Sequence, residues 1–271
     1  MCIFVWHVLK RTQYQFYIKM ILIKYSIFLL LISLVSCTNN EVKDTKELLI
    51  YCGITMEKPI AEIAQIIEKQ EDCKIFIIIG GSENLYKSFL INEVGDMYIS
   101  GSESYIEKGI AYNYIVDTVF VGINKAAMMV KEGNPKNINN CLESLTNKDY
   151  KVVIGNPKSG SIGKETKKIL DKKNIFNEVN ENTVYYTTDS KDLILALKNN
   201  EADLIINWYA SSTWDDNKSY VDVLNIDKEF AAEKKLFLGL LKYSKYPNIS
   251  KSFITYASSP KGRAIFKKYG F

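Results

Sequence analysis

From residue 48 to the C-terminus, short apolar segments typical of strands alternate with segments whose apolar residues recur at helical spacing. Such alternation predicts an α/β fold, with mostly parallel sheets and helices on both faces. Ligands of such sheets bind at the carboxyl ends of the strands. We expect strands at 48–52, 74–79, 96–100, 118–123, 126–130, 151–154, 183–186, 202–206, 221–224 and 235–241, and helices at 59–69, 83–92, 163–173, 189–199, 250–257 and 260–268.

Small and hydroxyl-bearing residues stand where several of these strands lead into helices. They are Thr55, Ser82, the pair Ser159 and Gly160, and the pair Asp189 and Ser190. Taken singly, each is explained by ordinary helix capping, for which Ser, Thr and Asp are common. If they converge, however, their hydroxyl groups and the unpaired N–H groups of the helix N-termini would form an anion site without Lys or Arg.

Six segments of the chain carry short motifs in a fixed order. They are 49–55, 80–85, 95–100, 155–157, 198–209 and 259–271. Together they resemble the periplasmic molybdate-binding proteins of ABC importers. No single motif is specific, and the order of all six carries the resemblance. It implies two α/β lobes of the class II periplasmic binding protein type, which close over a tetrahedral oxyanion.

The resemblance also implies roles for individual residues. Thr55 and Ser82 would be hydroxyl ligands from the first lobe. Ser159 or Gly160 would give a backbone donor from the second lobe, Asp189 or Ser190 another, and Tyr209 a phenolic donor. Tyr209 could equally be a strand-end aromatic packed against Trp208 or Trp214. Thr55 stands where the family usually has Ser, and Glu83 follows Ser82 where a small residue is common, so the choice among oxyanions stays open.

The expected lobes are discontinuous in sequence. Residues 48–122 with 222–271 would form lobe 1, and 123–221 would form lobe 2. The mechanism implied is capture of the anion in an open form, followed by hinge closure around residues 122–127 and 221–225. A membrane permease would then receive the anion.

The N-terminal 36 residues have the features of an export signal. Its apolar run, from Tyr25 to Val35, is too short to span a bilayer of roughly 30 Å. Leu-Val-Ser-Cys, ending at Cys37, resembles the lipobox of bacterial lipoproteins, which implies cleavage before Cys37 and its lipidation. Translation is expected to start at Met20, and the polar residues 37–47 would be a tether. The protein would be exported and lipid-anchored, facing the periplasm or the cell exterior.

Composition removes several function classes. Without residues 1–36 the 35 basic residues fall to 31, against 31 acidic ones, so a nucleic-acid partner, which needs a basic face, loses its main support. The only histidine, His7, lies in the expected signal, which excludes Ser-His-Asp and His-ligated metal sites from the mature chain. Cys52, Cys73 and Cys141 show no pairing rhythm, and the first two suit an apolar core. We expect no metal and no cofactor.

Two other function classes, an enzyme and an adhesion protein, have some support in the sequence. The pattern Ser-x-x-Lys of penicillin-binding proteins occurs at 161–164, but it recurs at 258–261 and its companion motifs are absent, which argues against an enzyme. A surface adhesion lipoprotein would use the 18 tyrosines but has no need of four strand-to-helix hydroxyl turns. The sequence therefore predicts a monomeric binding protein for molybdate or tungstate that serves an ABC permease, with sulfate, thiosulfate or a small organic acid as alternatives.

Overall fold

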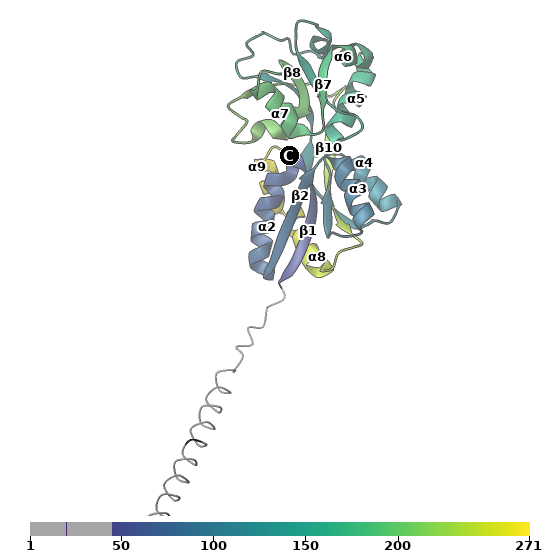
Figure 1. Ribbon diagram of the computed structural model, residues 1–271, viewed down its shortest axis with the longest axis vertical. Coiled ribbons are helices and arrows are strands. Elements are labelled where there is room, and N and C mark those ends of the chain that lie inside the picture. The colour runs from purple at the N-terminus through teal and green to yellow at the C-terminus, as the bar shows by residue number, and fades with distance from the viewer. Residues whose placement is uncertain (1–19, 21–44) are drawn as a thin grey trace, which may run out of the picture. The chain divides into compact units, whose positions relative to one another are not determined.

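The computed structural model describes Met20 and residues 45–271. Apart from Met20, the expected signal lies outside these residues, as do the lipidation site Cys37 and most of the tether. Residues 45–271 build two five-stranded sheets that are each covered by helices (Figure 1). No helix within the described residues combines the length and the apolar character needed to cross a bilayer.

Lobe 1 contains the sheet with strand order β2-β1-β3-β10-β4. β10 runs antiparallel to both of its neighbours, and the other four strands share one direction. The strands are β1 (Lys46–Gly53), β2 (Cys73–Gly80), β3 (Met97–Ile99), β4 (Ile115–Asn124) and β10 (Lys234–Leu241), and the helices are α2 (Glu57–Glu71), α3 (Ser82–Asn92), α4 (Glu103–Ala111), α8 (Pro247–Ser258) and α9 (Pro260–Lys268).

Both faces of this sheet are buried, because side chains alternate along each strand. On β1, Leu48, Ile50 and Cys52 pack into the core that α2, α8 and α9 cover. The intervening Tyr51 packs into an aromatic core under α3 and α4. This two-sided burial explains why β1 reads as a continuous apolar run rather than as an alternating one.

Lobe 2 contains the second sheet, with strand order β7-β6-β8-β5-β9 around a single core. β5 is the strand that runs opposite to the other four. The strands of lobe 2 are β5 (Ala126–Lys131), β6 (Val152–Gly155), β7 (Thr183–Thr187), β8 (Leu204–Trp208) and β9 (Val221–Leu224). Its helices are α5 (Ser161–Lys173), α6 (Phe176–Asn182) and α7 (Ser190–Lys198). Short 3-10 helices are η1 (Ile54–Met56) in lobe 1, and η2 (Leu142–Thr146) and η3 (Tyr209–Thr213) in lobe 2.

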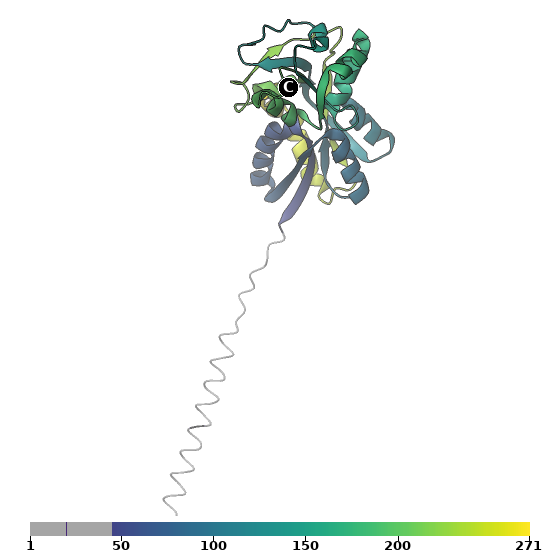
Figure 2. The ribbon, with the colours of Figure 1, turned by 45° about the horizontal axis from the view of Figure 1, so that its top comes forward.

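The two sheets have the same arrangement, and the chain crosses between them twice. β4 leads directly into β5, and β9 leads into β10, so the strand that enters each lobe is the antiparallel one. In the view of Figure 2, turned from that of Figure 1, the two lobes again meet along one seam. This is the predicted two-lobe α/β fold, with sheets that are mixed because of β5 and β10.

Three details differ from the prediction. The short helices α4 and α6 were not expected. The expected boundary at residue 222 falls inside lobe 2, because β9 pairs with β5, so the second crossing lies between Leu224 and Lys234. β1 begins at Lys46, inside the expected tether. Cys52 and Cys73 are free and buried, which confirms their expected place in the core.

Candidate functional site

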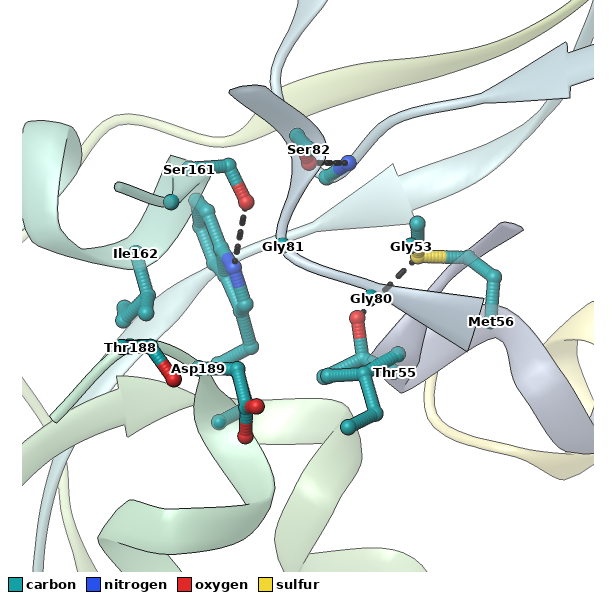
Figure 3. Close-up of a pocket in the computed structure, with 15 residues that line it drawn as sticks. Gly53, Thr55, Met56, Gly80, Gly81, Ser82, Ser161, Ile162, Thr188 and Asp189 are labelled. Atoms are coloured by element: carbon teal, nitrogen blue, oxygen red, sulfur yellow. Dashed lines mark hydrogen bonds between the residues drawn. The ribbon is translucent and has the colours of Figure 1, made fainter. Parts of the chain in front are cut away.

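A pocket lies where the carboxyl ends of strands from both lobes meet. It holds about 250 Å³ of space that no protein atom fills, counted out to its mouth. Both lobes contribute to its wall, and Figure 3 shows the hydroxyl groups and glycines of the wall around a common space. The lining residues are Gly53, Ile54, Thr55, Met56, Gly80, Gly81, Ser82 and Gly101 from lobe 1, and Gly160, Ser161, Ile162, Thr188, Asp189, Ser190 and Trp208 from lobe 2.

Three of the helical N-termini at this pocket have glycine as N-cap. Gly53, Gly81 and Gly160 precede η1, α3 and α5, and no side chain caps any of the three. The first N–H groups of a helix have no partner within the helix. Without a capping side chain, these donors and the positive end of the helix dipole are available to an anion.

The fourth N-terminus is different. The Asp189 carboxylate accepts hydrogen bonds from the backbone N–H groups of Lys191 and Asp192, at 2.8 and 3.2 Å, and so caps α7. Asp189 therefore acts as an ordinary helix N-cap. Ser190, the first residue of α7, is buried at the pocket and its hydroxyl remains as a donor there.

Two serine hydroxyls at the pocket receive a hydrogen bond from the protein. The backbone N–H of Gly101 donates to Ser82 Oγ at 3.4 Å, and Trp208 Nε1 donates to Ser161 Oγ at 3.2 Å (Figure 3). A hydroxyl that accepts an N–H still has its own proton to donate. Thr55 Oγ1 donates a hydrogen bond to the Met56 thioether, at 3.1 Å, and a thioether is a weak acceptor that a ligand oxygen can replace. All three hydroxyl protons can thus turn to a ligand.

Glycine allows the lobes to approach closely at this point. A Cβ on Gly101 would lie 2.6 Å from Ser161 Oγ and 3.2 Å from Trp208 Nε1, both in the other lobe. A Cβ on Gly81 would lie 3.1 Å from the carbonyl oxygen of Ser159. A side chain at Gly101 would therefore displace the Ser161 hydroxyl and crowd the Trp208 indole of the other lobe.

No lysine or arginine is among the lining residues of this pocket in the described chain. The nearest ion pair spans the lobes beside it, from Lys164 on α5 to Glu83 on α3, at 3.3 Å. Lys164 also lies 4.1 Å above the Tyr105 ring, and Lys87 pairs with Glu83 at 3.4 Å. Burial alone would raise the pKa of Glu83. The nearby Tyr105 hydroxyl and the two ammonium groups outweigh it and hold that pKa below its usual 4.5.

Five of the seven residues predicted for the site lie together in this wall: Thr55, Ser82, Gly160, Asp189 and Ser190. Ser159 is outside it, with its hydroxyl directed to the carbonyl groups of Asn156 and Thr188, each at 3.3 Å. Tyr209 is also outside. It begins η3, and its ring lies 4.2 Å from Lys125 Nζ.

Gly101, Ser161 and Trp208 line the pocket without having been predicted to do so. Side chains alternate along a strand, so at the end of β8 only one of Trp208 and Tyr209 can face the pocket, and it is Trp208. Ser161 belongs to the Ser/Gly-rich turn before α5, but only Ser159 and Gly160 of that turn were predicted as ligand residues. Its place as the first residue of α5 was the signal that could have found it.

Residues 48–271 match the sequence model of a family described as bacterial extracellular solute-binding protein. The chain belongs to this family. Among its relatives, YvgL of Bacillus subtilis, named as a candidate ABC transporter substrate-binding lipoprotein, is 24% identical over 262 residues. That alignment covers 92% of this chain and 98% of YvgL.

Solved structures show the same two-lobe fold. The periplasmic molybdate-binding protein of Azotobacter vinelandii superposes with a TM-score of 0.70 at 15% identity, over 82% of this chain and 97% of that one. The periplasmic binding protein AfuA of Actinobacillus pleuropneumoniae, with fructose-6-phosphate bound, also gives 0.70, at 16% identity, over 83% of each chain. The fold thus serves both a small inorganic oxyanion and a sugar phosphate in these two proteins.

Proposed function

We propose that this protein captures a tetrahedral oxyanion, molybdate or tungstate, and delivers it to the permease of an ABC importer while anchored to the membrane through Cys37. The observation that carries the ligand class is the pocket itself. Glycine-capped helical N-termini and free hydroxyl protons from both lobes meet there, and no cationic side chain lines it.

Neutral donors suit an anion that accepts hydrogen bonds on every oxygen. Each charge-assisted hydrogen bond to such an anion is worth roughly 1.5–3 kcal/mol, so a few well-placed donors can replace a salt bridge. The space of about 250 Å³ in the pocket includes space open to solvent, so the enclosed part is smaller still. Its size supports a compact inorganic anion over a sugar phosphate.

One observation favours a second candidate, a protonated oxyanion such as hydrogen phosphate. Asp189 is the one carboxylate in the described wall of the pocket, and a ligand hydroxyl could donate a hydrogen bond to it. The Asp189 carboxylate accepts hydrogen bonds from two backbone N–H groups and still has lone pairs for a further donor. Sulfate, molybdate and tungstate lack such a proton and would not use Asp189 in this way.

Calorimetric titration separates these ligands. We expect one-to-one binding of molybdate and tungstate, at least tenfold tighter than that of sulfate, thiosulfate, phosphate or fructose-6-phosphate. Asp189→Asn should not weaken molybdate binding, because the amide oxygen can still cap α7 and the change removes a negative charge from the pocket wall. Preferred binding of phosphate that is lost in Asp189→Asn would establish the second candidate. Binding of the sugar phosphate alone would refute both.

A further inference from the structure

Exposed apolar side chains gather at one end of lobe 1, the end opposite to the pocket. Ile91 is 80% exposed at the C-terminal end of α3, and Tyr112 is 64% exposed just after α4. Both helices begin at the pocket end of the sheet and run away from it. We call this surface the lobe 1 pole, and its apolar members are Ile91, Val94, Ile110, Tyr112 and Val116.

Strand pairing places these segments together. The end of β10 pairs with the start of β4, with Leu241 opposite Ile115. The N–H of Leu241 donates to the carbonyl oxygen of Asp96, and the N–H of Asp96 donates to that of Leu49 near the start of β1. The loops before β3 and β4 therefore share one end of the sheet with the beginning of β1.

Lysine and tyrosine side chains border the apolar residues. Lys242 lies 4.6 Å from the Tyr114 ring and 5.1 Å from the Tyr243 ring, and Tyr112 packs beside Tyr114 with ring centroids 6.4 Å apart. Aromatic residues with polar tips, and lysines with long apolar stems, are the side chains that favour the boundary between lipid and water. Exposed acidic groups, Glu93, Glu107 and Asp117, lie on the same segments as the exposed Lys108, Lys242 and Lys245.

The chain enters lobe 1 at this same end. β1 starts at Lys46, and only residues 38–45 separate it from Cys37. A segment of that length spans at most about 30 Å even when fully extended. If Cys37 carries the lipid anchor, as the proposed function holds, the tether keeps the start of β1 within that distance of the bilayer, and the lobe 1 pole lies at this end of the sheet. Such a high local concentration makes even a weak surface interaction effective.

We infer that, between encounters with the permease, the lobe 1 pole docks on the lipid surface of the membrane, which leaves the pocket and lobe 2 directed away from it. The contact is made by the apolar and tyrosine side chains. The bordering acidic and basic groups nearly balance, so attraction to anionic lipid contributes little.

Quenching by brominated lipid tests this contact. The full chain is expressed so that Cys37 is processed, and the lipidated protein is reconstituted into phosphatidylcholine and phosphatidylglycerol vesicles that contain a lipid brominated on its acyl chain. The tryptophan of Tyr112→Trp reports on the lobe 1 pole. Tyr220→Trp is the matched control, because Tyr220 is 51% exposed but belongs to lobe 2. The fluorescence of the parent protein is subtracted, since Trp208 and Trp214 are buried in lobe 2.

We expect at least twofold stronger quenching for Tyr112→Trp than for Tyr220→Trp. The difference should persist from about 0.01 M to about 1 M salt, over which the Debye length falls from about 30 to about 3 Å. Equal quenching in the two variants, with oxyanion binding intact, would overturn the docking and leave the proposed function standing. Self-association through this surface in place of quenching would do the same. Protein without lipid on Cys37 would overturn the docking together with the anchor.

Discussion

At the scale of single residues, the hydroxyl groups of Thr55 and Ser82 separate ligand binding from helix capping. Neither side chain caps its helix, and both are buried at the pocket. Thr55→Val and Ser82→Ala should each weaken oxyanion binding tenfold to a hundredfold, because each removes a charge-assisted hydrogen bond worth roughly 1.5–3 kcal/mol. Titration gives the affinity, and thermal melting shows whether stability is preserved.

Ser259→Ala is the matched control for these variants. Ser259 Oγ accepts the N–H of Gly262 at 3.1 Å and caps α9 far from the pocket wall. Its loss should lower the free energy of unfolding by roughly 0.5–2 kcal/mol and leave affinity unchanged. If Thr55→Val and Ser82→Ala behave like this control, their hydroxyl groups do not bind the ligand.

The positions of single residues could be predicted from the sequence where local rules decide them. A hydroxyl residue just after a buried strand, such as Thr55 or Ser82, lies at the carboxyl edge of the sheet. This position is set by the strand itself and does not depend on contacts made elsewhere in the chain. Whether the Tyr209 side chain faces the pocket depended on the register of β8. In the structure it is the Trp208 side chain, at the end of this strand, that lines the pocket. Gly101 could not be found from sequence, because its role depends on the approach of Ser161 from the other lobe.

At the scale of elements, the ion pair between α3 and α5 should favour the closed arrangement of the lobes. Lys164→Met removes this pair, whereas Lys87→Met removes a pair that lies within lobe 1. A partly exposed pair is worth up to about 1 kcal/mol, so Lys164→Met should weaken oxyanion binding by up to about fivefold. Lys87→Met should leave it unchanged. Equal effects in titrations of the two variants would show that the pair does not act between lobes.

The difference in oxyanion affinity between the parent protein and Lys164→Met should depend on pH, because Glu83 titrates. Because its pKa in the folded protein lies below 4.5, the ionised carboxylate stabilises the fold fully above about that pH. The contribution is lost as the pH falls through the lowered pKa. The affinities of the parent and of Lys164→Met should therefore differ at neutral pH and converge in acid below that value.

The pattern of strands was predictable from sequence because each strand is a short apolar run with a turn after it. The helix α4 was not, since it is only nine residues long and includes Gly109. Gly109 fits there because Ile115 packs against it, where a Cβ would lie 2.5 Å from the isoleucine Cδ1. The second crossing was also placed too early, because the sequence of β9 does not show which sheet it joins.

At the scale of the whole molecule, the anchor and the binding unit should be separable. Cys37 lies outside the described residues, and the family match begins only at residue 48. Cys37→Ser should therefore move the protein from the membrane fraction to the soluble fraction with oxyanion affinity unchanged. A variant that still sediments with membranes would contradict the lipid anchor, because the weak contact of the lobe 1 pole needs the tether to hold it at the bilayer.

The central claim is that neutral donors between the two lobes hold an oxyanion, and its most direct test is the dependence of molybdate affinity on salt. A closed pocket without a cationic side chain is little affected by screening, whereas exposed lysines lose most of their attraction as the Debye length falls. Titrations in inert salt from about 0.01 M to about 0.15 M, over which that length falls from about 30 to about 8 Å, should give one-to-one binding with affinities within about twofold of each other. A steep fall in affinity over that range, or no binding at either concentration, would contradict the account.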